Sequence, residues 1–373
     1  MRLVKLAYEL EGEVLGKTIY TADGRVLLRA GTALTKGYIS ALLRKGYTRV
    51  YLQDEFAPDV LVDDALTDQT RVTATAIAKE TLDNLVQGHP AEFSKVREIV
   101  EQILNEVSGT PELMVGLSAI RNFDEDTFTH SVNVCVLSLI LGKALLYRRE
   151  ELVKLGMGAL LHDVGKMKIP REILGKPDRL TREEFEQIKT HSLAGYEILK
   201  GKVEISLLSA HVALQHHEKV DGSGYPRGLR GGEIHEFARI TAIADMFDAL
   251  TSDRAYRCRV PPHEAARLLK LKSGKHLDER LTTRFLERIA FYPNGTIVRL
   301  NNGEVGVVVQ QQAGRPERPV VRVMTDAQLR LIPPREINLF HARNFNIKLV
   351  LPDWPQQVKD QVRAAAIARI QSV

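Results

Sequence analysis

Helical periodicity in the middle of the chain is the feature that most limits what this protein can fold into. From about residue 71 to residue 290, apolar side chains recur at spacings of three and four, the period of an amphipathic α-helix. Helices that succeed one another pack around a shared apolar core, so the pattern predicts one all-α region at 71–290. The expected helices are 72–85, 93–107, 127–146, 151–161, 182–199, 203–216, 237–250 and 262–272.

Residues 1–53 predict a small α+β unit in front of this helical region. Two strand-like runs, 18–21 and 25–29, flank an Asp-Gly pair that favours a hairpin turn. A helical run at 34–45 and a strand at 48–52 follow. Residues 54–70 then carry six acidic side chains and no Lys or Arg, which indicates an acidic linker.

The pattern changes again at residue 291, where short strands replace helices. Runs at 296–300 and 304–309 flank an Asn-Asn-Gly turn, and a third strand is expected at 319–324. Residues 291–352 therefore predict a small antiparallel β module, and residues 353–373 predict an amphipathic C-terminal helix. The expected fold class is mainly α, a helical bundle with a small α+β unit before it and a β module after it.

Composition narrows the class of protein. Hydrophobic residues make up 44% of the 373 residues and charged residues 27%, which is typical of globular proteins and argues against disorder. No apolar run reaches the ~18 residues of a membrane span, and the N-terminus turns acidic too early for a signal peptide. The two cysteines, Cys135 and Cys258, predict no disulfide framework, so we expect a cytoplasmic protein. The net charge of +5 favours anionic partners only weakly, because a solvated basic surface explains it equally well.

Histidines and aspartates gather in the helical region, both inside helices and at their ends. A lone histidine on an apolar helix is more often a core or surface residue than a ligand. Asp245 is a stronger signal, because it lies among apolar neighbours such as Ile243 and Phe247, where a carboxylate is costly unless it is paired or metal-bound. An ion pair or a helix cap would also satisfy it. The candidate metal ligands are His130, His162, Asp163, His191, His216, His217 and Asp245.

These candidates supply enough donor atoms for two metal ions. A carboxylate can bridge two cations through its two oxygens, whereas a histidine nitrogen binds one. Nitrogen and oxygen donors without thiolate suit Fe, Mn, Zn or Co better than Ca or Mg. Two ions about 3.5–4 Å apart would generate a hydroxide and clamp a phosphoester. Asp126, four residues before His130, would share its helix face as an extra ligand, an outer partner of His130 or a helix-start residue.

Two segments of the helical region resemble the signatures of the HD-GYP family, a subgroup of the HD metal-dependent phosphohydrolases. They read HDVGKMKIP at 162–170 and HHEKVDGSGYP at 216–226, and the stretches 173–181 and 244–254 are similar as well. The resemblance covers residues 120–285. It implies an HD-type helical bundle that cleaves the bacterial second messenger cyclic di-GMP in signal transduction, with divalent iron or manganese as the metal.

The same resemblance implies roles for single residues. The seven candidates match metal-ligand positions with Asp163 as the bridging carboxylate, and Asp126 matches the position that holds a third metal in some members. Without the resemblance, a lysine such as Lys166 favours a helix C-terminus and the arginines are ordinary surface charges. The positions that hold substrate are matched by Lys166, Tyr225, Arg254 and Arg257.

The implied reaction is attack of a metal-bridging hydroxide on one phosphorus of cyclic di-GMP, giving linear pGpG and then GMP. Asp163 would take part through the metals, while Lys166 and one arginine would offset charge on the nonbridging oxygens. Gly222 and Gly224 would let the loop backbone approach a ligand, unless they only form a flexible turn.

Two alternatives stay open. One is a cyclic di-GMP sensor or scaffold with little turnover, because geometry around the ligands can silence a complete ligand set. The other is an HD phosphohydrolase for another cyclic dinucleotide or a nucleotide. The helices expected in 71–107 would mediate a homodimer or only pack internally. The β module lacks aromatic residues interleaved with basic ones, which argues against binding of nucleic-acid polymers.

Overall fold

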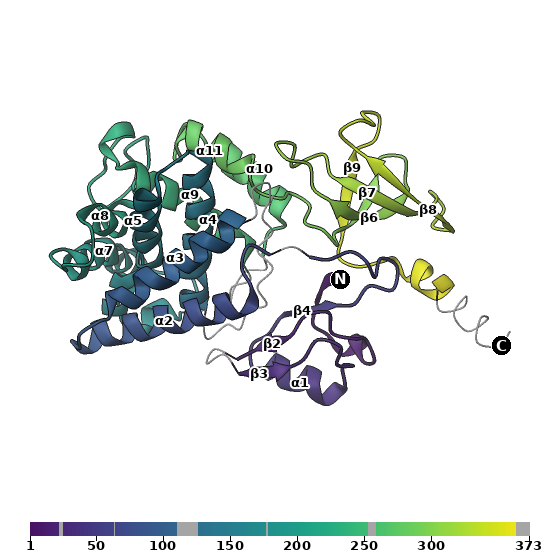
Figure 1. The fold of residues 1–373 in the computed structure, drawn as a ribbon, viewed down its shortest axis with the longest axis horizontal. Helices are drawn as coiled ribbons and strands as arrows, with labels where there is room; N and C mark the ends of the chain where they lie inside the picture. The colour runs from purple at the N-terminus through teal and green to yellow at the C-terminus, as the bar shows by residue number, and fades with distance from the viewer. Residues whose placement is uncertain (22–24, 63, 110–125, 177, 253–258, 363–373) are drawn as a thin grey trace.

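The computed structural model describes residues 1–21, 25–62, 64–109, 126–176, 178–252 and 259–362. Figure 1 shows the helical region at the left, an α+β region formed by the N-terminal residues below it, and a β region at the upper right. The expected fold class, mainly helical with a C-terminal antiparallel β module, is confirmed.

Each of the eight expected helices is present in the helical region, and two further short helices, α6 and α11, follow α5 and α10. The helices are α2 (Asp68–Gln87), α3 (Phe93–Gly109), α4 (Asp126–Ala144), α5 (Arg149–Leu160), α6 (Arg171–Leu174), α7 (Arg182–Leu199), α8 (Leu207–Gln215), α9 (Glu236–Thr251), α10 (Pro262–Lys272) and α11 (Glu279–Leu286), with 3-10 turns η3 (Val164–Lys168) and η4 (Gly231–Glu233).

Two helix starts differ from the prediction by four residues, because serine and threonine caps set them. The side-chain oxygen of Ser206 accepts a hydrogen bond from the Ser209 N–H (3.0 Å), so α8 begins four residues later than expected. The Thr67 oxygen accepts from the Thr70 N–H (3.2 Å), so α2 begins at Asp68, inside the stretch interpreted as a linker.

Helix α4 is the central helix of the bundle. Every residue from 130 to 142 is buried, which agrees with an apolar sequence that shows no preferred face. It packs against α2, α3, α5, α9 and α11. His130 and Asn133 are polar exceptions on this helix, and Cys135 is a buried free thiol, while Cys258 lies outside the described residues.

The N-terminal region contains the expected hairpin and one strand that was not expected. Strand β2 pairs antiparallel with β3, and β1 pairs antiparallel with β4. The Asp-Gly turn of the hairpin lies outside the described residues. Leu15, Ile39 and Val50 are fully buried in the core of this region. The elements are β1 (Arg2–Lys5), η1 (Tyr8–Leu10), β2 (Ile19–Tyr20), β3 (Val26–Leu28), α1 (Lys36–Arg44) and β4 (Arg49–Leu52).

The C-terminal region is a five-stranded antiparallel sheet in the order β8-β7-β6-β5-β9. Neighbouring residues face opposite sides, as Ile297 and Val298 show by packing into different clusters. Two strands were not predicted, and one of them contains two prolines, which an edge strand tolerates because its outer N–H groups need no partner. The strands are β5 (Ile297–Leu300), β6 (Val305–Gln310), β7 (Val320–Thr325), β8 (Leu331–Asn338) and β9 (Ile347–Leu351).

Part of the stretch interpreted as a linker packs against the β region. Ala57 and Val60 are buried in one cluster with Trp354. The Phe56 ring stacks on the Trp354 ring at 4.5 Å, and the Trp354 indole N–H donates to the Asp54 carboxylate (3.1 Å). A helix turn at 356–362 follows, and the rest of the expected C-terminal helix lies outside the described residues.

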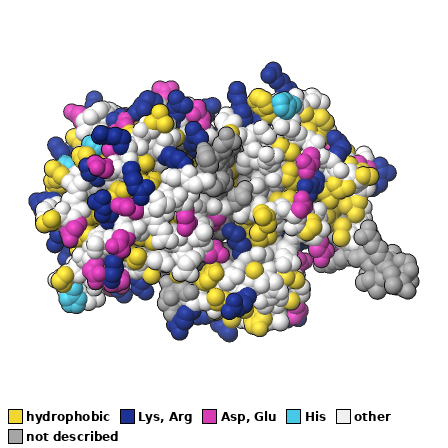
Figure 2. Space-filling view, viewed as in Figure 1, with side chains coloured by type: hydrophobic (Ala, Val, Ile, Leu, Met, Phe, Trp, Pro, Cys, Tyr) yellow, Lys and Arg dark blue, Asp and Glu magenta, His cyan; other side chains and the backbone are white. Residues whose placement is uncertain are grey.

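Helices with the length and apolarity needed to cross a membrane are absent from the described part of the chain. On the face shown in Figure 2, basic and acidic side chains intermingle over the helical region. The net charge of +5 therefore does not gather into one basic patch on that face.

Candidate metal centre

The structure brings all seven predicted metal ligands together inside the helical region. They come from three helices, α4, α7 and α9, and from the chain segments that directly follow α5 and α8. One group of four has its ligand atoms within 4.8 Å of one another, and a second group of three meets the same limit. The first group is Asp163, His191, His216 and His217, and the second is His130, His162 and Asp245.

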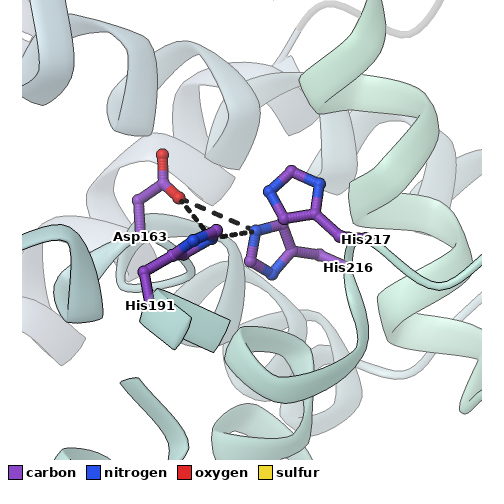
Figure 3. Close-up of side chains that lie close together, drawn as sticks. All are labelled: Asp163, His191, His216 and His217. Atoms are coloured by element: carbon purple, nitrogen blue, oxygen red, sulfur yellow. Dashed lines mark hydrogen bonds and ion pairs between the residues drawn. The ribbon is translucent and has the colours of Figure 1, made fainter. Parts of the chain in front are cut away.

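Asp163 lies between the two groups, with one carboxylate oxygen directed at each. Oδ1 is 3.5 Å from His191 Nε2 and 3.6 Å from His216 Nε2 (Figure 3). Oδ2 is 3.3 Å from His162 Nε2 and 3.8 Å from His130 Nε2. This is the arrangement that a carboxylate needs in order to bridge two cations.

Backbone carbonyls fix the tautomer of three ligand rings. The Nδ1–H groups of His162, His191 and His216 donate to the carbonyls of residues 159, 188 and 213 at 2.7, 2.6 and 3.0 Å. A carbonyl oxygen only accepts, so each Nδ1 carries the proton of the neutral ring and each Nε2 keeps its lone pair. These three lone pairs face Asp163 rather than the protein interior.

Unsatisfied polar atoms show that these residues fit a bound cation. His130 Nε2, His162 Nε2 and Asp163 Oδ1 are buried without a hydrogen-bond partner among the described residues, and such groups are costly to bury. The Nε2 atoms of His191 and His216 are 3.4 Å apart although neither carries a hydrogen. Divalent cations would satisfy all of these donor atoms at once, and the absence of sulfur favours transition metals that accept nitrogen and oxygen.

Burial and neighbouring charges keep most ligands in the form that binds metal. Burial lowers the pKa of His191 to about 4 and that of His217 well below its ordinary value, so both rings are neutral at pH 7. Burial alone would raise the pKa of Asp163, but His162 and Lys166 outweigh it and leave the pKa well below its usual range. The pKa of Asp245 is lowered in the same way, against burial, by His130.

His130 differs from the other ligand rings because two carboxylates contact it. Its Nδ1 lies 2.7 Å from Asp248 Oδ2, and its Nε2 lies 3.2 Å from Asp245 Oδ1. Burial works to lower the pKa of His130, but the two aspartates raise it to about 9. A cation bound by Asp245 and His130 would displace the proton on Nε2, as metals do when they bind histidine.

The predicted substrate residues are placed only in part. Lys166 lies on η3 and forms an ion pair with Asp163 Oδ2, with 29% of its side chain exposed at the edge of the centre. The Tyr225 ring packs on the His217 ring, with centroids 4.8 Å apart. Arg254 and Arg257 lie outside the described residues. Asp126 is the first residue of α4, and its side chain also lies outside the described part.

The glycines near Tyr225 serve the chain itself. A Cβ on Gly224 would lie 2.4 Å from the Lys219 nitrogen, so Gly224 permits one part of the loop to pack on another. The buried Glu218 carboxylate accepts hydrogen bonds from the N–H groups of Arg227 (2.7 Å) and Leu229 (3.0 Å). At Gly224 the close contact that a side chain would prevent is with the loop's own backbone, and close approach to a ligand stays a prediction.

Two contributors to the centre were not found in the sequence. Asp248 is buried on an apolar helix like Asp245, and that signal was available in the sequence. Gly165 lets η3 pack directly on α7, since a Cβ there would lie 1.9 Å from the His191 carbonyl oxygen. The packing partner of Gly165 is far along the chain, so no local pattern could identify it.

Comparison with family models agrees with this geometry. Residues 82–281, more than half of the chain, match a model described as "HD domain". Residues 297–354 match a model described as "KOW domain associated with HD domain". The first match contains all seven ligand positions, and the second covers the five-stranded sheet.

The chain is also similar to proteins that are named as phosphodiesterases. A cyclic di-GMP phosphodiesterase of Pseudomonas aeruginosa is 34% identical over 250 residues, which are 67% of this chain and 60% of that protein. One from Thermotoga maritima is 40% identical over 177 residues, 47% of this chain and 48% of that protein. A 3'3'-cGAMP-specific phosphodiesterase of Vibrio cholerae is 37% identical over 144 residues, 39% of this chain and 31% of that protein. This chain thus aligns with 60% or less of the length of each of these relatives.

Proposed function

The chain belongs to the HD domain family, and from that premise we propose that it is a metal-dependent phosphodiesterase that hydrolyses cyclic di-GMP. The observation that carries the proposal is the position of Asp163 between two groups of ligands whose Nε2 atoms face it. Two phosphodiesterase relatives of this chain are named for cyclic di-GMP.

We assign the cation ligands as two groups that share Asp163. His191, His216 and His217 would hold one divalent ion, and His130, His162 and Asp245 the other. When bound, such ions lower the pKa of water and withdraw charge from phosphoryl oxygens. Iron and manganese are the proposed metals, because both accept imidazole and carboxylate donors. A third ion near Asp126 stays a prediction from the family resemblance.

The chain's own residues would bind and orient the substrate. Lys166, which pairs with Asp163, would offset negative charge on a nonbridging phosphoryl oxygen. Tyr225 presents a ring face beside His217, on which a nucleoside can pack. Arg254 and Arg257 keep the substrate-binding role that the family resemblance implies. The proposed products are pGpG and then GMP.

A second candidate substrate follows from relatives that are named for another cyclic dinucleotide. The Vibrio cholerae protein is named for 3'3'-cGAMP, which differs from cyclic di-GMP in one base. The chemistry at phosphorus is the same for both, so the choice depends on contacts to the base. We place the activity in bacterial second-messenger signalling in the cytoplasm, in keeping with a free buried thiol at Cys135. A homodimer through α2 and α3 stays a prediction.

The decisive experiment is anaerobic purification of the full chain, metal analysis, and timed chromatography of products from cyclic di-GMP, 3'3'-cGAMP and cyclic di-AMP. We expect about two metal ions per chain, fastest turnover with cyclic di-GMP, and pGpG before GMP. Fastest turnover with 3'3'-cGAMP would reassign the substrate. Tight binding of cyclic di-GMP without turnover, in chains loaded with either metal, would instead identify a sensor.

A further inference from the structure

We propose that Asp248, Asn133 and Arg71 are positioning residues that hold His130 in the geometry for cation binding. They form a buried chain of hydrogen bonds that runs from α9 through α4 to α2. The proposal rests on the proposed function only in taking His130 as a cation ligand.

Asp248 is held through both of its carboxylate oxygens. Oδ2 is 2.7 Å from His130 Nδ1, and Oδ1 accepts a hydrogen bond from the Asn133 side-chain amide at 3.0 Å. Ser252 Oγ also donates to Oδ2 at 3.3 Å. A carboxylate is an acceptor here, so His130 Nδ1 carries hydrogen and only Nε2 is left to bind a cation.

Arg71 fixes the orientation of Asn133. Its Nη1 donates to Asn133 Oδ1 at 2.7 Å, and its Nη2 donates to Asp64 Oδ1 at 2.6 Å. A guanidinium can only donate, so the amide oxygen of Asn133 must face Arg71 and the NH₂ group must face Asp248. One orientation of the Asn133 amide therefore satisfies both neighbours, and the direction of every hydrogen bond in the series is fixed.

These polar residues are shielded from water. The exposed fractions are 1% for Asp248, 0% for Asn133, 6% for His130 and 8% for Arg71. Buried charges are costly to desolvate, and apolar residues of similar volume often fill such a space at no loss of stability. A buried polar arrangement that is costly and held in one orientation indicates a functional role. The hydrogen bonds end at His130, so we infer that the role is to orient His130.

The chain of contacts extends beyond the helical region. Asp64 precedes α2, and its Oδ2 lies 3.8 Å from Lys17 Nζ in the N-terminal region. Atom-to-atom contacts thus lead from the N-terminal region to a cation ligand. Through Arg71, a displacement of Asp64 would reach Asn133, Asp248 and then His130.

The test is a manganese titration of the apo full-length chain, with the cobalt-substituted absorption spectrum as a second readout. In Asp248→Asn we expect the affinity for one of two ions to fall about 10–100-fold, as loss of such partners costs elsewhere, while the other ion keeps its affinity. The cobalt bands of one ion should change as well. Unchanged affinities together with an unchanged cobalt spectrum would overturn the proposal.

Graded variants of Arg71 separate positioning from folding. Arg71→Met removes both hydrogen bonds, whereas Arg71→Lys keeps a cation that reaches one acceptor. We expect Arg71→Met to weaken the same ion as Asp248→Asn and Arg71→Lys to restore part of the affinity. Equal affinities in both Arg71 variants and the parent chain would contradict the role of Arg71.

Asp278→Asn is the matched control for loss of stability. It removes a partly buried ion pair with Arg239 in the same region without touching the chain of contacts, and it should lower the melting temperature but leave both manganese affinities unchanged. If the parent chain binds two ions but hydrolyses no dinucleotide, the proposed function is wrong. The inference about His130 would not be affected by that result. If the parent chain hydrolyses the dinucleotide and Asp248→Asn binds both ions as the parent does, the proposed function stands and this inference is wrong.

Discussion

Among single residues, Asp163 has the largest share in the centre, because its two oxygens face different ligand groups. Its position follows from η3, which begins directly after it and packs on α7. The carboxylate is buried with only 3% of the residue exposed, and histidine and lysine neighbours keep its pKa low. Loss of this one side chain therefore affects both proposed cations.

Asp163→Ala should lose both metal ions and lower kcat by more than ~100-fold, the upper end of the cost of losing an outer partner of a ligand. Metal analysis and product formation from cyclic di-GMP measure the two effects. Asp178→Ala, at an exposed aspartate between α6 and α7, is the matched control and should behave like the parent chain. Full turnover in Asp163→Ala would exclude the two-cation arrangement.

Among helices and loops, the centre depends on two close approaches of backbone. Gly165 lets η3 lie against α7, and the loop that carries Tyr225 is tied to the buried Glu218. The first contact brings Asp163 to His191, and the second brings Tyr225 to His217. Both contacts are made by residues, Gly165 and Glu218, that are not metal ligands. Substitutions at Gly165 or Glu218 therefore alter the geometry of the centre without removing a ligand.

Gly165→Ala should destabilise the helical region by about 1–3 kcal/mol or more, because the added methyl group overlaps the His191 carbonyl. Thermal unfolding and metal content should both fall. Gly232→Ala is the control, since a Cβ there meets nothing within 4 Å. If Gly165→Ala and Gly232→Ala have the same melting temperature, η3 can shift to accommodate the methyl group and the close contact is not required for stability.

Glu218→Gln tests the loop without touching a ligand. The amide can accept one of the two backbone N–H groups but turns a donor toward the other, so we expect KM for cyclic di-GMP to rise several-fold with metal content unchanged. The cost of one unsatisfied buried group, about 1–3 kcal/mol, sets the upper limit of the effect. Steady-state kinetics measures it, and an unchanged KM would mean that the loop does not hold substrate.

For the molecule as a whole, the N-terminal strand is joined to the β region by a partly buried ion pair. Arg2 Nε donates to Asp353 Oδ1 at 2.8 Å, and Arg2 Nη2 donates to Glu13 at 3.1 Å. The N-terminal amine donates to the Val60 carbonyl at 2.8 Å. The N-terminal strand therefore contacts both the stretch before α2 and the β region directly. Figure 1 shows the N-terminus between these parts.

Asp353 predicts a pH dependence of stability. Burial raises the pKa of Asp353, but Lys359 and Arg2 outweigh it and leave the pKa below its ordinary value. The stabilisation is therefore complete above the unfolded pKa of about 4 and is lost as pH falls through the folded value. Asp353→Asn should lower the melting temperature at pH 7 and flatten its decline below about pH 4. Equal pH profiles for both chains would contradict this role.

Several features could be predicted from the sequence because their causes are local. Nine helices, the N-terminal hairpin and four further strands follow from apolar periodicity and turn residues. The candidate ligands follow from residue types that are costly to bury and from a resemblance carried by short motifs. Strand β8 was missed because its two prolines read as a break, and only its place at the sheet edge permits them.

The sequence by itself determined the helical class of the fold and the set of donor atoms, since periodicity and side-chain chemistry are properties of each segment. Only the tertiary structure decided which donors form each group and which oxygen of Asp163 faces which group. It also decided that a series of hydrogen bonds connects Arg71 and Asp248 to His130. It also decided that part of the acidic stretch packs on the β region through Trp354. These are contacts between residues far apart in the chain, and the packing of helices and strands alone brings them within reach.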